Sequence, residues 1–352
     1  MFHSLDCRSA LVIGNYKPLK YPRSLLFMLP PESAHALTLA ALRAIGRFPS
    51  TTEAEAAPPS IRLAGLELPN RVGLAAGFDK DGLAVDGLRR LGFGFIEIGT
   101  VTPKPQPGNV QRPRVIRIPG SGAIINRLGF PSAGAAVVAA RLSRLQRRGI
   151  LGVNIGKNAT TRNEQAVDDY VSCFEALHAH ADYVAINVSS PNTPQLRELQ
   201  RVERLQSILE ALLEARARSR TTSSRPLPFF LKISPDLEPS DLSDIARLIS
   251  TLGIEGVIAT NTTVSRPGSV RLPIGAPLDG GLSGQPLLPL TLSVVSSLRA
   301  ALPPQTVIVG CGGIQSGEDA LQMRRAGADL IQVYSGLVFR GPKLVRELRE
   351  VL

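Results

Sequence analysis

Short apolar runs alternate with longer helical patterns from residue 71 to the end of the chain. The runs are almost continuously apolar, which is typical of parallel strands that helices cover on the outside. Eight such alternations predict an α/β fold, a (β/α)8 TIM barrel, although counting alone does not exclude an open doubly wound sheet. We predict strands at 71–76, 95–100, 151–156, 183–189, 229–234, 256–261, 306–311 and 330–335, and helices at 132–148, 163–180, 199–219, 239–252, 288–302, 316–326 and 342–352.

Polar residues gather where the predicted strands end. In a barrel, the carboxyl ends of all strands face one rim, which is where active sites lie. The second strand is followed by a long segment, 101–131, and a loop of that length at the catalytic rim is usually functional. We therefore predict one shared pocket at this rim, against the alternative that strand ends are simply solvated. The residues at the strand ends are Lys80, Thr100, Asn154, Asn187, Lys232, Asn261, Gly313 and Ser335.

The chain before the barrel has a different pattern. Segments 22–29 and 32–47 are predicted as two short helices joined by a proline turn, and 48–60 as a polar, proline-rich linker. Their apolar side chains exceed what one thin stripe requires, so the pair is either a cap packed on the barrel or an amphipathic module on a membrane. The predicted organisation is an extension of unknown role at 1–20, the helical module with its linker at 21–60, and the barrel at 61–352.

The composition narrows the classes of function. The chain has 352 residues and a formal net charge of +11, which favours anionic lipid, nucleic acid or small anions as partners. The arginines are scattered and aromatic residues make up only 5%, so no nucleic-acid partner is expected. The three cysteines are far apart and show neither a disulfide framework nor metal-ligand spacing, so no metal is expected. No apolar run is long enough to span a bilayer.

The segment 187–194, NVSSPNTP, has the strongest chemical signal in the chain. It follows an apolar strand, so its amides and hydroxyls are delivered to the rim. Ser, Pro and Asn are also ordinary turn residues, and the tetrad SSPN alone would be interpreted as a capped turn. Its position at a strand end, beside the other polar strand ends, favours a functional loop.

Six motifs occur in order along the chain: AAGFDKDG (75–82), NRLGF (126–130), NVSSPNTP (187–194), ATNTT (259–263), GGLSG (280–284) and GCGGI (310–314). Together they resemble the quinone-dependent class 2 of the dihydroorotate dehydrogenase family, from about residue 21 to the end. The resemblance implies oxidation of dihydroorotate to orotate in de novo pyrimidine biosynthesis. FMN would accept the hydride, and a membrane quinone, ubiquinone or menaquinone, would be the final electron acceptor.

The resemblance places Ser190 at the position of the catalytic base. That base removes the C5 proton of dihydroorotate while the C6 hydride passes to flavin N5. The soluble classes of the family have cysteine at this position, whereas the quinone-linked class has serine. A serine hydroxyl is a poor base, so it needs a proton relay through water or a neighbouring hydroxyl.

The resemblance also assigns the binding residues. A pyrimidine edge alternates C=O and N–H groups, which side-chain amides recognise, and a rim lysine suits the carboxylate of the substrate. Substrate contacts are implied for Lys80, Asn126, Arg127, Leu128, Gly129, Phe130, Asn187, Asn192, Asn261 and Thr262. Flavin contacts are implied for Ala76, Gly77, Phe78, Asp79, Lys80, Thr100, Asn154, Asn187, Lys232 and Thr260.

Two further features bear on the flavin. Lys232 ends an apolar strand, so it is either a cation that stabilises the negative charge formed on flavin reduction or half of a structural ion pair. Gly284, Gly313, Tyr334 and Ser335 lie around the last two strands, where barrels often bind phosphate. A single phosphate site suits FMN better than FAD, and no GxGxxG dinucleotide fingerprint follows a first strand.

Other interpretations remain open. A soluble FMN barrel with a different electron acceptor would favour cysteine at position 190 and no helical front end, and a barrel that only binds a phosphate ligand would leave Ser190 without a role. Because no segment spans a bilayer, we expect peripheral membrane attachment through the N-terminal helices, on the cytoplasmic face of the inner membrane if the source is bacterial. Gln195 stands where the family usually has glycine, and this departure bears on how the catalytic loop closes.

Overall fold

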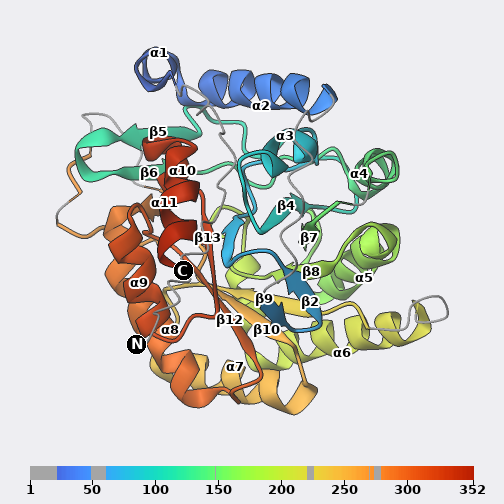
Figure 1. Cartoon of the computed structure of the whole chain (residues 1–352). Coiled ribbons are helices and arrows are strands. Elements are labelled where there is room, and N and C mark those ends of the chain that lie inside the picture. The colour runs from blue at the N-terminus through green and yellow to red at the C-terminus, as the bar shows by residue number, and fades with distance from the viewer. Residues whose placement is uncertain (1–21, 49–60, 147, 220–225, 269, 273–278) are drawn as a thin grey trace, which may run out of the picture.

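The computed structural model describes residues 22–48, 61–146, 148–219, 226–268, 270–272 and 279–352. At its centre is a closed barrel of eight parallel strands in the order β10-β12-β13-β3-β4-β7-β8-β9 (Figure 1). All eight predicted strands are confirmed, and so is the closed barrel over the open sheet. The strands are β3 (Val72–Leu74), β4 (Phe95–Val101), β7 (Ile150–Ile155), β8 (Tyr183–Asn187), β9 (Phe229–Ile233), β10 (Gly256–Ala259), β12 (Val307–Cys311) and β13 (Leu330–Val333).

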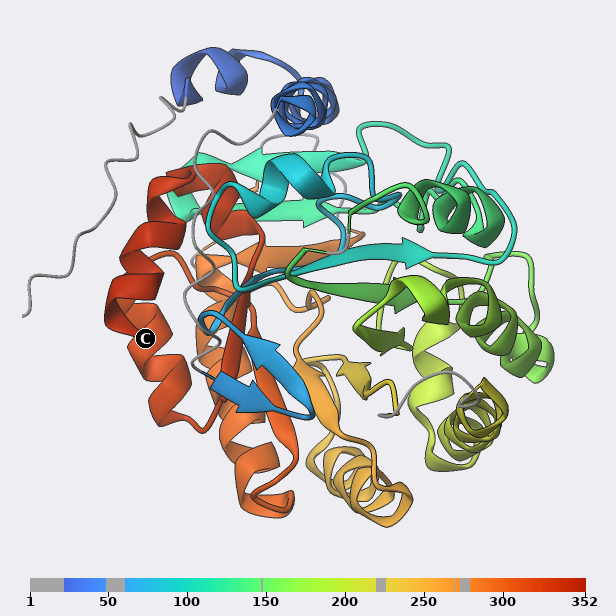
Figure 2. The same ribbon diagram turned by 45° about the vertical axis from the view of Figure 1, so that its right-hand side comes forward.

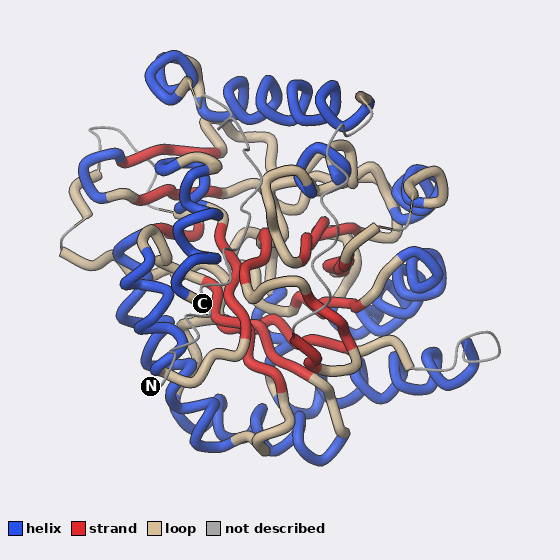
Figure 3. The backbone as a smooth tube through the Cα atoms, in the orientation of Figure 1, coloured by secondary structure: helices blue, strands red, loops and turns tan. Residues whose placement is uncertain are grey.

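Helices surround the barrel strands (Figure 3). Each predicted barrel helix is present, but several are shorter than predicted. Helix α4, for example, begins only after Gly134, whose φ of 88° lies outside the helical region. Two short helices, α3 and α10, were not predicted. The helices are α3 (Val85–Arg89), α4 (Ala135–Leu142), α5 (Ala166–Leu177), α6 (Val202–Ser219), α7 (Pro239–Leu252), α8 (Leu288–Ala301), α9 (Gly317–Arg325), α10 (Ser335–Arg340) and α11 (Lys343–Val351).

Large aromatic rings fill the amino-terminal half of the barrel. A Cβ added to the nearest glycine of the neighbouring strand would lie 2.0–2.4 Å from each ring, so these glycines make room for the rings. A short hairpin, β1 (Ile61–Leu63) and β2 (Leu66–Leu68), packs its buried leucines against the same cluster. This end of the barrel is therefore closed, and a cavity can form only toward the carboxyl rim. The ring and glycine pairs are Phe95 with Gly73, Tyr183 with Gly152, and Phe230 with Gly256.

A second, antiparallel sheet stands at the carboxyl rim. Its strands are β5 (Val115–Ile118) and β6 (Ala123–Asn126), both from the 101–131 insertion, and β11 (Gly281–Gly284). Helices α1 (Arg23–Met28) and α2 (Pro31–Arg47) lie above β5 and β6 in Figure 2.

The helix pair also packs on the barrel. A Cβ at Gly87 of α3 would lie 2.0 Å from the carbonyl oxygen of Leu42, so α2 and α3 are in close contact. Residues 1–20 and the linker beyond Phe48 lie outside the described residues.

Candidate active site

One cavity of about 950 Å³ opens at the carboxyl rim of the barrel and continues beneath α1 and α2. Lys80, Ser190, Lys232 and Asn261 all line it, although they follow or end four different strands. The sequence predicted that these four side chains would meet, and the structure confirms it. The rest of the wall is largely apolar and includes Leu26, Phe27, Leu39 and Ile45 of the helical pair.

Most of the predicted site residues line this cavity, but three do not. Asp79 is fully buried, and its carboxylate accepts the backbone N–H groups of Leu83 and Ala84 at 2.8 and 2.7 Å, which fixes the turn before α3. Arg127 instead forms an ion pair with Asp279, in which Nη1 lies 3.0 Å from Oδ1. Asn154 lies inside the barrel, below the cavity wall.

The predicted residues that line the cavity form one continuous set from the end of β3 around to the start of α10. They are Ala76, Gly77, Phe78, Lys80, Thr100, Asn126, Leu128, Gly129, Phe130, Asn187, Ser190, Asn192, Lys232, Thr260, Asn261, Thr262, Gly284, Gly313, Tyr334 and Ser335.

Lys80 follows β3 and places an ammonium group in the cavity. Its Nζ donates to the carbonyl oxygen of Gly77 at 2.6 Å. Burial lowers the pKa of Lys80 to about 8, although the carboxylates of Asp81, Asp79 and Glu32 oppose this shift. A cation that is desolvated in this way is well placed to bind an anion, because the anion restores part of the lost solvation.

The loop after β8 carries Ser190, which is only 5% exposed. Its Oγ accepts a hydrogen bond from the backbone N–H of Asn192 at 3.3 Å. Among the described residues no carboxylate or imidazole hydrogen-bonds Ser190, so a proton leaving this hydroxyl must pass to water or to another hydroxyl. Nearby, Asn192 Oδ1 and Thr262 Oγ1 are buried without a hydrogen-bond partner in the described structure, and both residues line the cavity. Unpartnered buried polar atoms are costly, and here a polar ligand would satisfy them.

Side-chain amides form a ladder across the strand ends. Asn187 Nδ2 donates to Thr100 Oγ1 at 2.9 Å, and Asn187 Oδ1 accepts from Asn261 Nδ2 at 3.2 Å. Asn261 Nδ2 also donates to Ser189 Oγ at 3.0 Å. The ladder fixes which atom of each amide faces its neighbours, so the cavity has a defined pattern of donors and acceptors.

The far end of the cavity is built from backbone and small side chains. Gly284 (φ 96°) and Gly313 (φ 84°) adopt left-handed conformations that glycine favours. A Cβ at Gly313 would lie 2.4 Å from Leu288, so only glycine lets the chain pass so close. Ser335 begins α10, and its Oγ lies 2.8 Å from Ser283 Oγ. Backbone N–H groups and two hydroxyls in this arrangement fit a phosphate group.

A model of the dihydroorotate dehydrogenase family matches residues 60–352. The chain belongs to this family. It is 48% identical over 343 residues to the dihydroorotate dehydrogenase (quinone) of Coxiella burnetii, which covers 95% of this chain and 96% of that protein. It is 51% identical to the same enzyme of Acidithiobacillus ferrooxidans, over 94% of this chain and 93% of that one. The crystal structure of DHODH from Eimeria tenella in complex with ferulenol superposes with a TM-score of 0.83 at 38% identity, over 93% of each chain.

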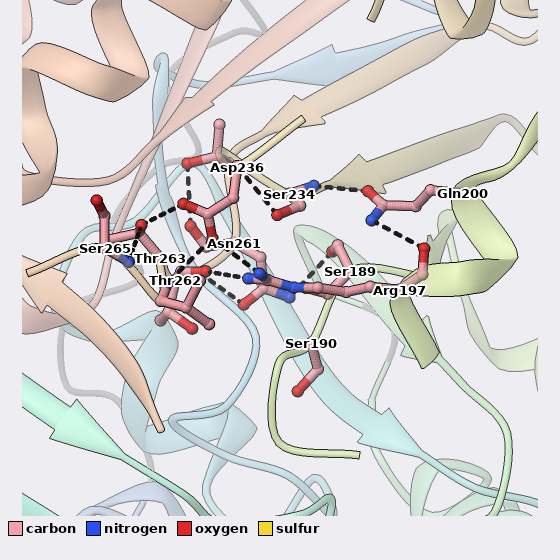
Figure 4. A network of polar contacts seen from close by, with 12 residues as sticks. Ser189, Ser190, Arg197, Gln200, Ser234, Asp236, Asn261, Thr262, Thr263 and Ser265 are labelled. Carbon is pink, nitrogen blue, oxygen red and sulfur yellow. Dashed lines mark hydrogen bonds and ion pairs between the residues drawn. The ribbon is translucent and has the colours of Figure 1, made fainter. Parts of the chain in front are cut away.

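Arg197 connects the loop that carries Ser190 to its neighbours (Figure 4). The Arg197 guanidinium donates to the carbonyls of Ser189 and Thr262 at 3.1 and 2.8 Å and to Asp236 Oδ2 at 2.8 Å. Asp236 in turn accepts from the Thr263 hydroxyl. The loops after β8, β9 and β10 are therefore cross-linked through one ion pair, and the Ser190 side chain points away from it.

Sequence reasoning missed two groups at this site. Glu97, Tyr183 and Gln332 form a buried polar cluster in the barrel, and Glu97 lies 3.6 Å from the Lys232 ammonium. A charged or amide residue within an apolar strand run, as in FIEIGT and LIQVYS, was the available signal. His35 of α2 also lines the cavity, and burial lowers its pKa to about 4, so its ring is neutral at pH 7. No pattern in the α2 sequence indicated this.

Proposed function

We propose that this chain is an FMN-dependent dihydroorotate dehydrogenase that passes electrons to a membrane quinone. The observation that carries the proposal is that a single cavity joins Ser190, Lys80 and the amide ladder to an apolar space under α1 and α2. A polar end for substrate and an apolar end for quinone are what the two half-reactions require. The relatives named dihydroorotate dehydrogenase (quinone) support the same assignment.

Substrate binds at the polar end. Lys80 pairs with its carboxylate, and the ring edge meets Asn126, Asn192, Asn261 and Thr262. Asn192 Oδ1 and Thr262 Oγ1 supply an acceptor and a hydroxyl that lack partners within the described structure. Ser190 takes the proton from the substrate and passes it to water or to a neighbouring hydroxyl, since no imidazole or carboxylate of the described residues hydrogen-bonds it.

FMN fits the remaining part of the cavity. When bound, it supplies the hydride acceptor. The backbone near Gly284 and Gly313 and the hydroxyl of Ser335 would hold its phosphate, and Lys232 and Thr100 would contact its ring system. The fit rests on the polar groups at this end of the cavity: the hydroxyls of Ser283 and Ser335 lie 2.8 Å apart, beside two glycines at which an added Cβ would clash with neighbouring residues.

Quinone enters between α1 and α2, and these helices attach the protein to a membrane surface. Large apolar side chains are exposed on this pair: Leu25 (67%), Met28 (81%), Leu37 (54%) and Phe48 (69%). Arg23, Arg43 and Arg47 are exposed beside them, which suits anionic lipid headgroups. Within the described residues, no helix has the length and apolarity to cross a bilayer. We place the attachment on the cytoplasmic face of the inner membrane, for a bacterial source.

The decisive experiment measures flavin reduction. The purified protein should contain FMN, and dihydroorotate should bleach its visible absorbance. Ser190→Ala should retain FMN and lose about 10²–10⁴-fold in bleaching rate, because general bases contribute rate factors of that size. Ser207→Ala, on the exposed face of α6, is the matched control. Bleaching of Ser190→Ala at the parental rate would remove Ser190 from the chemistry.

A second experiment separates the quinone from a soluble acceptor. Met28→Glu combined with Leu37→Glu should weaken binding to anionic lipid vesicles and slow quinone reduction, while bleaching by dihydroorotate continues at the parental rate. Val137→Glu, an exposed valine on α4, is the control. Unchanged vesicle binding and quinone rates would favour the soluble FMN barrel with another acceptor.

A further inference from the structure

Glu97 is a fully buried carboxylate inside the barrel, and four strands supply its partners. Its Oε1 accepts from Asn154 Nδ2 at 2.9 Å and lies 3.6 Å from Lys232 Nζ. Its Oε2 accepts from Gln332 Nε2 at 2.7 Å and from the Tyr183 hydroxyl at 3.0 Å. A charge at this depth is tolerated only when it is paired and hydrogen-bonded, and both oxygens meet that condition.

The contacts of Glu97 set the direction of the hydrogen bonds above it. Because Glu97 accepts from Asn154 Nδ2, the Oδ1 of Asn154 must face the rim, where it accepts from Thr100 Oγ1 at 2.6 Å and Asn187 Nδ2 at 3.2 Å. Asn187 then presents Oδ1 to Asn261 Nδ2 at 3.2 Å. The hydrogen bonds of Glu97 therefore determine the orientation of every amide in the ladder.

Glu97 also balances the charge of the cavity wall. The side chain of Lys232 is 6% exposed, and Glu97 is the one carboxylate within ion-pair distance of it in the described part of the chain. Lys232 and Gln332 line the cavity, whereas Glu97 lies directly behind them and does not. The cavity therefore faces a cation that has a single counter-ion, and the net charge of this wall depends on Glu97.

We propose that Glu97 is a positioning residue that sets the reduction potential of the bound flavin. It holds Lys232 and Asn154 in place and offsets the positive charge of Lys232 toward the flavin. The inference rests on the proposed function, because it requires FMN in this part of the cavity. Removing the carboxylate charge should favour the reduced flavin, which carries the added negative charge.

The test uses FMN-loaded protein and compares the midpoint potential of the bound flavin with that of the parent. In Glu97→Gln, the ratio of the FMN dissociation constants, oxidised over reduced, should rise at least tenfold. For a two-electron couple that change equals a potential more positive by about 30 mV. Glu318→Gln, which removes an exposed carboxylate from α9, should leave the potential unchanged. A residue that only stabilised the fold would not move the potential of the flavin that remains bound.

A second comparison decides the question if Glu97→Gln alone does not fold. Lys232→Met combined with Glu97→Gln leaves neither partner of the pair as an isolated buried charge. Its potential should be at least 30 mV above that of Lys232→Met, which is again a tenfold change in the ratio. Equal potentials in either comparison, with FMN bound, would overturn the role of Glu97 and leave the proposed function intact. A parent protein that binds no FMN would overturn both.

Discussion

Orotate binding should weaken as pH rises through the pKa of Lys80. Burial lowers that pKa to about 8 in the protein without substrate. The ammonium form, which pairs with the carboxylate of orotate, therefore predominates below pH 7, falls to one half at pH 8 and is largely lost by pH 9. An ordinary exposed lysine would remain charged throughout this range, since its pKa is about 10.4.

The size of the effect follows from that pKa. If only the protonated form binds, the apparent Kd is multiplied by 1 + 10^(pH−8), which is about 1.1 at pH 7, about 2 at pH 8 and about 11 at pH 9. The Kd should thus rise about tenfold from pH 7 to pH 9. By linkage, binding should also take up about half a proton at pH 8 and close to one proton at pH 9.

Isothermal titration calorimetry on FMN-loaded protein measures both quantities. Lys80→Arg is the control, because a guanidinium keeps its charge over the whole range. Any ionisation of orotate itself affects both proteins equally, so it cancels in the ratio of the parental Kd to the Kd of Lys80→Arg. A ratio that stays constant from pH 7 to pH 9 would show that the charge of Lys80 does not bind the substrate.

Three further predictions concern stability. Arg197→Met should lower the free energy of unfolding in urea by about 2–4 kcal/mol, because it breaks a largely buried ion pair that cross-links three loops. Arg204→Met, whose partners are exposed, should lower it by under about 1 kcal/mol, and equal urea midpoints for the two variants would contradict this reasoning. Gln195→Gly should raise the free energy of unfolding by about 0.5–1 kcal/mol, because φ is 54° at this position and glycine adopts a positive φ without strain. Gln195→Ala should leave the free energy of unfolding unchanged in the same assay. Burial lowers the pKa of His35 to about 4, so as the pH falls the unfolded chain protonates this ring at a higher pH than the folded protein does. The free energy of unfolding should therefore fall from pH 6.5 toward pH 4 by up to about 3 kcal/mol, less where solvent reaches the ring, and His35→Gln should flatten that slope.

The barrel could be predicted because its strands carry a strong local signal. Each is an almost continuous apolar run, and every one is buried on both faces in the structure. The elements that were missed are short. The helices α3 and α10 span five and six residues and the strands of the β1–β2 hairpin three each, too few for a period of 3.6 or 2 to stand out.

The site could be predicted where a side chain lies at a strand end, and less well elsewhere. Lys80, Asn187 and Asn261 follow the rule that strand ends share a rim, and all three line the cavity. Asp79 belongs to the same motif as Lys80, but its carboxylate is held by the free N–H groups of the next turn. Such local competition for a side chain depends on backbone geometry, which the sequence does not show.

The two interpretations of Lys232 turn out to be compatible. The ion pair with Glu97 exists, and the same ammonium lines the cavity. The ion pair therefore holds the Lys232 ammonium at the cavity wall, where it can contact a ligand. The same logic extends along the barrel axis. Below Glu97 lie the aromatic rings, and the hydroxyl of Tyr183 donates to Glu97. Above Glu97 the amides hydrogen-bond one another up to the cavity, where Asn192 Oδ1, Thr262 Oγ1 and Gln332 Oε1 have no partner among the described residues. These three residues line the cavity, so a polar ligand bound there would satisfy atoms that the protein leaves without partners.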